Sequence, residues 1–120
     1  MKSQYLLRDD SQHPLYLALH QFWHPVAYSS DVNEKPQQVI LLDEKIAIAR
    51  IDGKVVALAD RCAHRGAALS QGMVVDGCFE CPYHGWRYDP QGHCKKIPAR
   101  NELVDVMKPK VKAYQATESA

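Results

Sequence analysis

Two pairs of cysteine and histidine residues give this sequence its clearest chemistry. Cys62 and His64 stand in the stretch CAH, and Cys81 and His84 stand in the stretch CPYH. Thiolate and imidazole groups are the side chains that proteins use to hold zinc and iron–sulfur clusters. The sixteen residues between His64 and Cys81 are enough to place the two pairs on separate loops. The spacing therefore predicts one metal site built from two loops.

Two kinds of centre fit these four side chains. A single tetrahedral zinc ion would stabilise the fold as a structural metal site. A two-iron centre would instead combine thiolates with neutral imidazoles, which make it less negative and raise its potential to about −150 to +300 mV. Gly66 and Gly85 follow the two histidines, and a backbone without Cβ can approach such a centre closely. The spacing alone leaves both centres open.

Composition and charge limit which other functions the chain could have. Its 120 residues suffice for one domain, and the formal net charge of +1 gives no electrostatic argument for nucleic acid. No apolar run approaches the ~18 residues that span a bilayer. Residues 1–10 do not resemble an export signal, so the four cysteines favour metal binding over disulfides. We expect a soluble, cytoplasmic protein that binds neither nucleic acid nor membrane.

Short elements separated by turns predict an all-β fold with one helix. Residues 11–22 (SQHPLYLALHQF) have apolar residues at roughly helical spacing after a serine cap, and predict a short helix. Residues 23–28 read as extended, and residues 32–38 as a loop. Short β-branched runs predict strands at Val39–Leu42, Ile46–Ile51 and Val55–Ala59, with turns at 43–45, 52–53 and 89–92. Residues 103–114 return to the alternating pattern of a strand.

The residues around the ligands resemble one family closely. The stretches CAHRGA (62–67) and CPYHGW (81–86) are similar to the ligand loops of Rieske proteins, in the oxygenase and ferredoxin branch. The stretch FWHPVA (22–27) is similar to the entry segment of Rieske non-haem iron oxygenase α-subunits. The resemblance covers about residues 15–115. It implies one Rieske domain over residues 1–120, an antiparallel β-sandwich with a cluster-binding subdomain at about 61–98.

The resemblance also implies the cofactor and its surroundings. One [2Fe–2S] cluster is expected on Cys62, His64, Cys81 and His84, and a zinc-stabilised binding module remains a remote alternative. Residues expected to surround the cluster are Arg65, Gly66, Gly85, Trp86 and Tyr88. Respiratory Rieske proteins have a disulfide where this sequence has Ala67 and Tyr83, and a serine in place of Trp86, so the lower-potential branch is favoured. Tyr88 retains a hydroxyl that in high-potential members reaches a ligand cysteine.

The expected function is one-electron transfer. The leading hypothesis is the N-terminal domain of a ring-hydroxylating-type oxygenase, and the alternative is a free-standing Rieske ferredoxin. The partners would be a reductase or ferredoxin as electron donor and an oxygenase catalytic domain as acceptor. No histidine follows His93, so we expect no mononuclear-iron site and no oxygenation by this chain alone. The family's last strand is not found before residue 120, which predicts an open sheet edge and self-association. Cys78 and Cys94 are expected to be buried or half-buried thiols.

Overall fold

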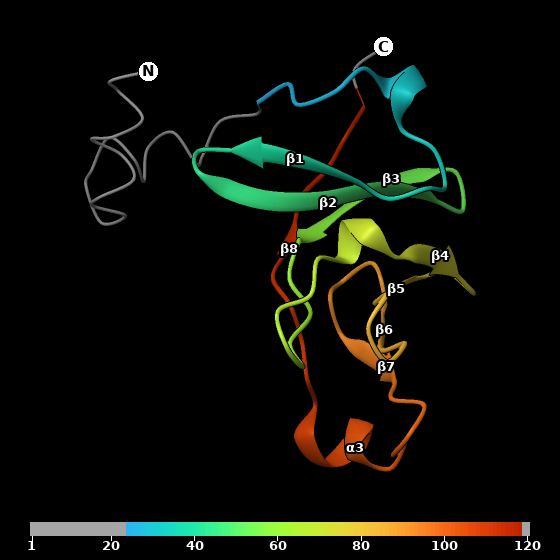
Figure 1. Cartoon of the computed structure of the whole chain (residues 1–120). Coiled ribbons are helices and arrows are strands. Elements are labelled where there is room, and N and C mark those ends of the chain that lie inside the picture. The colour runs from blue at the N-terminus through green and yellow to red at the C-terminus, as the bar shows by residue number, and fades with distance from the viewer. Residues whose placement is uncertain (1–23, 119–120) are drawn as a thin grey trace.

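The computed structural model of the chain describes residues 24–118 (Figure 1). The helix expected at residues 11–22 lies outside the described residues. No helix within the described part has the length and apolar character to cross a bilayer. The described elements are η1 (Ser29–Asp31), β1 (Gln37–Leu41), β2 (Glu44–Ile51), β3 (Lys54–Ala59), η2 (Leu69–Gln71), β4 (Met73–Val75), β5 (Cys78–Glu80), β6 (Arg87–Tyr88), β7 (Cys94–Lys96), α3 (Leu103–Met107) and β8 (Ala113–Tyr114).

The strands form two antiparallel sheets of four strands each. Sheet A has the order β1-β2-β3-β8, and sheet B has the order β4-β5-β6-β7. Figure 1 shows sheet A across the upper part of the molecule and sheet B below it, with the C-terminal segment running from α3 back to sheet A. The two antiparallel sheets confirm the expected all-β fold. The residues described contain almost no helix.

Left-handed turn residues set the register of the hairpins. Asp52 and Gly53 have φ of 52° and 79°, as the predicted β2–β3 turn requires, and Ile51 then pairs with Lys54. The β1–β2 turn was predicted at 43–45 but lies on residues 42–43, both with positive φ, so Glu44 already belongs to β2. A two-residue turn with positive φ at both residues has a backbone twist that matches the twist of the flanking strands. Strand β1 likewise begins at residue 37, inside the expected loop.

Sheet A is buried on both faces, and this divides the core in two. The face with Ala47, Ala49 and Leu58 packs against sheet B, where Phe79 and Tyr88 have no exposed surface. The opposite face, with Ile46, Ile48, Ala57 and Val32, forms a second apolar cluster. Since β2 contributes to both clusters, it reads as a continuous apolar run instead of an alternating one.

The strand expected over residues 103–114 is only partly present. Residues 103–107 form the single-turn helix α3, and only Ala113 and Tyr114 pair with β3. Leu103 and Val104 both pack against the core although they are adjacent, which the alternation of a strand does not allow. The backbone N–H of Leu103 donates to the Arg100 carbonyl at 2.9 Å, which closes the turn. The prediction of a strand here was wrong because alternation over a few residues does not distinguish it from one helical turn.

The predicted turn at residues 89–92 is confirmed and fixes the path of the chain toward β8. The Gly92 N–H donates to the Asp89 carbonyl at 2.8 Å, and the Val111 N–H donates to the Gly92 carbonyl at 2.9 Å. Gly92 has φ +87°, and a Cβ there would stand 2.2 Å from the Val111 carbonyl oxygen. Glycine is therefore required at this position both for its backbone conformation and for the close approach.

A pair of alanine substitutions separates these two requirements. Gly53 has φ +79° but open space around its Cβ position, so Gly53→Ala should cost only the ~1 kcal/mol of a left-handed alanine. Gly92→Ala adds a steric overlap, and we expect it to cost at least ~2 kcal/mol more. Urea unfolding of the two variants measures the difference. Equal losses for both would show that the contact with Val111 is easily relieved.

Candidate metal centre

The first loop with a cysteine–histidine pair follows β3 and is closed at its base by a buried carboxylate. Asp60 accepts hydrogen bonds from the Ser70 N–H at 2.7 Å and the Ser70 hydroxyl at 2.6 Å. A third bond at 2.7 Å comes from the Gln38 amide on β1. Within the loop, the Gly66 N–H donates to the Cys62 carbonyl and the Cys62 N–H to the Ala67 carbonyl, both at 2.8 Å. The loop therefore begins and ends at fixed points.

The second loop joins β5 to β6 and is a tighter turn. The Cys81 N–H donates to the Trp86 carbonyl at 2.8 Å, which continues the ladder to the edge of the loop. The Tyr83 N–H points at the Cys81 Sγ at 3.4 Å, which suits a thiolate that needs donors. His84 and Gly85 both have positive φ, 72° and 71°. Positive φ is uncommon for a histidine, and here it turns the His84 ring back toward the first loop.

The structure brings the four predicted ligands together as two pairs, divided by type. The Cys62 and Cys81 thiols are both buried, with 1% and 3% of their surface exposed, and they lie beside each other. The imidazoles of His64 and His84 meet edge to face, with ring centroids 5.3 Å apart. Each loop thus supplies one thiol to a thiol pair and one imidazole to an imidazole pair. Adjacency in the sequence pairs each cysteine with a histidine, so only the fold shows this division.

Side chains from the second loop and β6 reach across to the first loop. The Trp86 indole stacks on the His64 ring, with centroids 4.6 Å apart and planes inclined by 12°. The Tyr88 hydroxyl accepts the Ala63 N–H at 3.0 Å and lies 3.1 Å from the Cys62 Sγ. Trp86, just before β6, and Tyr88, within it, therefore meet His64 and Cys62 of the first loop. This contact fixes the two loops relative to each other.

One buried atom shows that the site is suited to a metal. The Nδ1 atom of His64 has no solvent-accessible surface and no hydrogen-bond partner. Buried polar side-chain atoms are nearly always paired, and a neutral imidazole nitrogen without a hydrogen-bond partner can be satisfied by a metal. Burial, and then the charge of Arg65, lowers the pKa of His64, which favours the neutral imidazole that binds metals. Burial raises the pKa of the Cys81 thiol to about 11, and a bound cation would be needed to deprotonate it.

The division into pairs favours two metal ions over one. Within residues 24–118, no three side chains of His, Cys, Asp or Glu converge as ligands of a single ion. A Rieske-type centre places two cysteines on one iron and two histidines on the other, so each iron needs only two side chains. A tetrahedral zinc would instead draw all four side chains to one point. The observed pairing therefore fits a two-iron centre.

The remaining residues singled out by the sequence lie as follows. Gly66 and Gly85 have positive φ, and Arg65 is exposed beside His64. Cys94 is buried and Cys78 half-buried; burial raises the pKa of both thiols, and all four cysteines are free. Sequence reasoning missed the bond between Asp60 and Ser70, whose signal was a polar residue at each end of the glycine-bearing loop.

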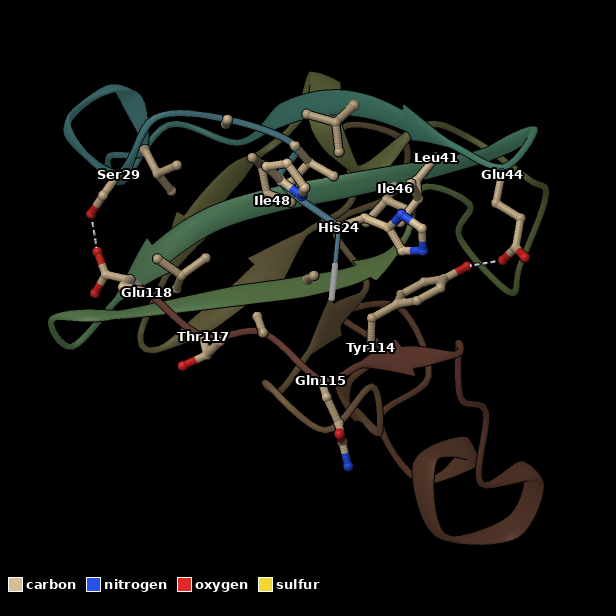
Figure 2. Close-up of a pocket in the computed structure, with 18 of the residues that line it drawn as sticks. His24, Ser29, Leu41, Glu44, Ile46, Ile48, Tyr114, Gln115, Thr117 and Glu118 are labelled. Carbon is tan, nitrogen blue, oxygen red and sulfur yellow. Dashed lines mark hydrogen bonds between the residues drawn. The ribbon is translucent and has the colours of Figure 1, made fainter. Parts of the chain in front are cut away.

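A wide groove lies elsewhere, on the outer face of sheet A. It encloses about 770 Å³ between residues 24–29 and 112–118. Figure 2 shows apolar side chains of β1 and β2, with Tyr114 bonded to Glu44 at one end and Ser29 to Glu118 at the other. None of the four candidate ligands lines it. The groove therefore has no part in the metal chemistry.

The comparisons with known proteins agree on one family. Residues 22–115 match the Rieske [2Fe-2S] domain. The methylxanthine N3-demethylase NdmB of Pseudomonas putida is 47% identical over 91 residues, which are 68% of this chain and 26% of that protein. The chain thus spans about a quarter of the length of this relative.

Solved structures share the fold as well as the sequence. The Pseudomonas putida CBB5 NdmA structure matches with a TM-score of 0.78 and 38% identity, over 84% of this chain and 32% of that one. The structure of apo dicamba monooxygenase matches with a TM-score of 0.76 and 36% identity, over 83% of this chain and 31% of that one. In both cases the match covers about a third of the larger chain.

The buried Asp60 carboxylate provides a test of how the first loop is held. Asp60→Ala leaves the Ser70 N–H and hydroxyl without their acceptor, and each unsatisfied buried group costs ~1–3 kcal/mol. We expect a loss of at least ~2 kcal/mol in unfolding free energy and faster release of bound iron to a chelator. Asp76→Asn is the control, since that carboxylate is exposed, its pair with Arg87 contributes under ~1 kcal/mol, and asparagine tolerates the left-handed backbone there. Similar iron release from both variants would contradict the role of Asp60.

Proposed function

The chain belongs to the Rieske [2Fe–2S] domain family, and from this membership we propose that it is the electron-transfer domain of a larger non-haem iron oxygenase. Membership implies a single [2Fe–2S] cluster, and bound there it supplies a one-electron redox couple. We assign Cys62 and Cys81 to one iron, and His64 and His84 to the other. The observation that carries this assignment is the pairing of thiol with thiol and imidazole with imidazole across two loops.

The protein's own residues define what surrounds the centre. Water is excluded from the thiol side of the centre, because the two thiols belong to the same buried core cluster as Leu69, Phe79 and Ile97. The His84 ring is exposed, and Tyr83 packs against it with ring centroids 4.9 Å apart. The imidazole side therefore faces solvent, and it is the side from which a redox partner has access.

The larger assembly is inferred from the relatives. NdmB and dicamba monooxygenase are demethylating or monooxygenating proteins by name, and this chain matches about a quarter to a third of such proteins. We propose that a reductase or ferredoxin supplies electrons and that an oxygenase catalytic domain, with its own iron, receives them. The oxygenase relatives support this assignment over a free-standing ferredoxin, as does the resemblance of residues 22–27 to the entry segment of oxygenase α-subunits.

Two further features belong to the same proposal. All four cysteines are free thiols, which suits a reducing compartment, and we assign the protein to the cytoplasm. The apolar groove on the outer face of sheet A, next to β8, is the surface that self-association would use. Light scattering at increasing concentration tests this; a monomer throughout would exclude it.

The proposed function is tested on anaerobically purified protein. We expect two irons and two sulfides per chain without zinc, and a visible absorption band that bleaches on reduction and returns on oxidation. His84→Ala should lose iron, whereas His93→Ala, which removes an exposed histidine outside the centre, should retain it. A colourless protein with one zinc per chain would overturn the assignment and leave a zinc-stabilised module.

The Tyr88 hydroxyl allows a prediction about the reduction potential. Its oxygen lies 3.1 Å from the Cys62 sulfur, and with Cys62 bound as a thiolate only the hydroxyl can donate, so this bond stabilises added negative charge on the sulfur. If that bond is worth ~1 kcal/mol more in the reduced state, Tyr88→Phe should lower the potential by about 45 mV, given ~59 mV per tenfold change for one electron. Tyr114→Phe, whose hydroxyl bonds Glu44 on sheet A, is the control and should leave the potential unchanged. An unshifted potential in Tyr88→Phe would contradict the prediction.

A further inference from the structure

The first ligand loop has a second face, which turns away from the second loop and borders a cleft. The cleft encloses about 340 Å³ between this loop and the segment that leads into β8. Four cationic side chains line it, and we refer to it as the basic cleft: Arg61, Arg65, Lys110 and Lys112. The candidate ligands Cys62 and His64 also form part of its wall. Any group that enters the basic cleft therefore lies directly against the ligand loop.

Most of this positive charge is not neutralised by the part of the chain that the structure describes. Lys112 lies 3.2 Å from Glu44 and over the Tyr114 ring. Among residues 24–118, no carboxylate forms an ion pair with Arg61, Arg65 or Lys110. The whole chain has a formal net charge of only +1, so this is a local concentration of charge. A concave surface of one sign focuses the field and attracts groups of the opposite sign.

The surface beside the ligands also carries features of a protein interface. Tyr83 is 58% exposed and packs edge to face against the exposed imidazole of His84. Exposed aromatic residues are enriched where proteins bind one another, and charged groups around them set orientation and association rate. The cations of the basic cleft are themselves exposed, as expected of groups that meet a partner surface and not of a closed anion pocket.

We propose that the basic cleft is the docking site for an acidic surface of the electron-donor protein. The inference rests on the proposed function, because it requires a redox partner. Carboxylates of the donor enter between the ligand loop and Lys110, and this brings the donor surface against the loop that holds Cys62 and His64. Docking is non-covalent and governed by charge, so it weakens as salt screens the interaction over about 10 Å at 0.1 M.

Lys110 is the residue on which to test the proposal, because it is exposed and lies outside the ligand loop. The probe is a purified plant-type [2Fe–2S] ferredoxin chosen for its net negative charge, titrated calorimetrically into the iron-loaded chain at low salt. We expect Lys110→Gln to weaken binding about twofold and Lys110→Glu about fivefold or more. Lys54→Glu makes the same charge change at the far end of β3 and should alter affinity by less than about twofold.

The outcomes separate this proposal from the one on which it rests. Equal effects of Lys110→Glu and Lys54→Glu, or affinity insensitive to salt, would overturn the docking site. If Lys110→Glu abolishes binding of inorganic phosphate but not of the ferredoxin, the basic cleft binds only small anions, and the proposal is also wrong. Iron content and visible absorption of each variant are measured in parallel. A wild-type chain without iron contradicts the proposed function itself, whereas an iron-loaded chain with unchanged affinities contradicts only the docking site.

Discussion

The contact between β6 and the first ligand loop is the interaction on which the candidate centre depends. Trp86 stacks on His64, and the Tyr88 hydroxyl meets both Cys62 and the backbone of Ala63. These are bonds between two separate loops, each too short to form a site alone. Because Trp86 immediately precedes β6 and Tyr88 lies in it, a single placement of this segment positions a thiol and an imidazole together. The thiol pair and the imidazole pair follow from that placement.

The rest of the fold maintains this contact. One face of sheet A packs on sheet B, so the strands that carry the two loops cannot shift independently. Asp60 closes the base of the first loop through Ser70 and reaches β1 through Gln38. Gly72, just beyond the loop, lies so close to the start of the second loop that a Cβ would stand 1.9 Å from the Glu80 carbonyl oxygen. Dense packing of this kind fixes ligand geometry before any metal binds.

The sequence predicted what depends on local chemistry and missed what depends on long-range packing. Cysteine and histidine in glycine-bearing turns are a local pattern, so the four candidate ligands and the Asp52–Gly53 turn could be read directly. The pairing of like ligands could not, since it arises from the placement of β6 against the first loop. The bond of Asp60 to Ser70 joins residues ten apart and becomes evident only when both are buried. Helix α3 was mistaken for a strand because its packing against the core, and not its local pattern, selects it.

The central claim is that two imidazoles, His64 and His84, bind one iron of a two-iron centre while the two thiols bind the other. The most direct measurement is pulsed electron paramagnetic resonance on reduced protein with ¹⁵N-labelled histidine, which counts the imidazole nitrogens coupled to the reduced iron. We expect two coupled nitrogens in the wild-type protein. One nitrogen or none in the wild-type protein would contradict the account and require a different set of ligands.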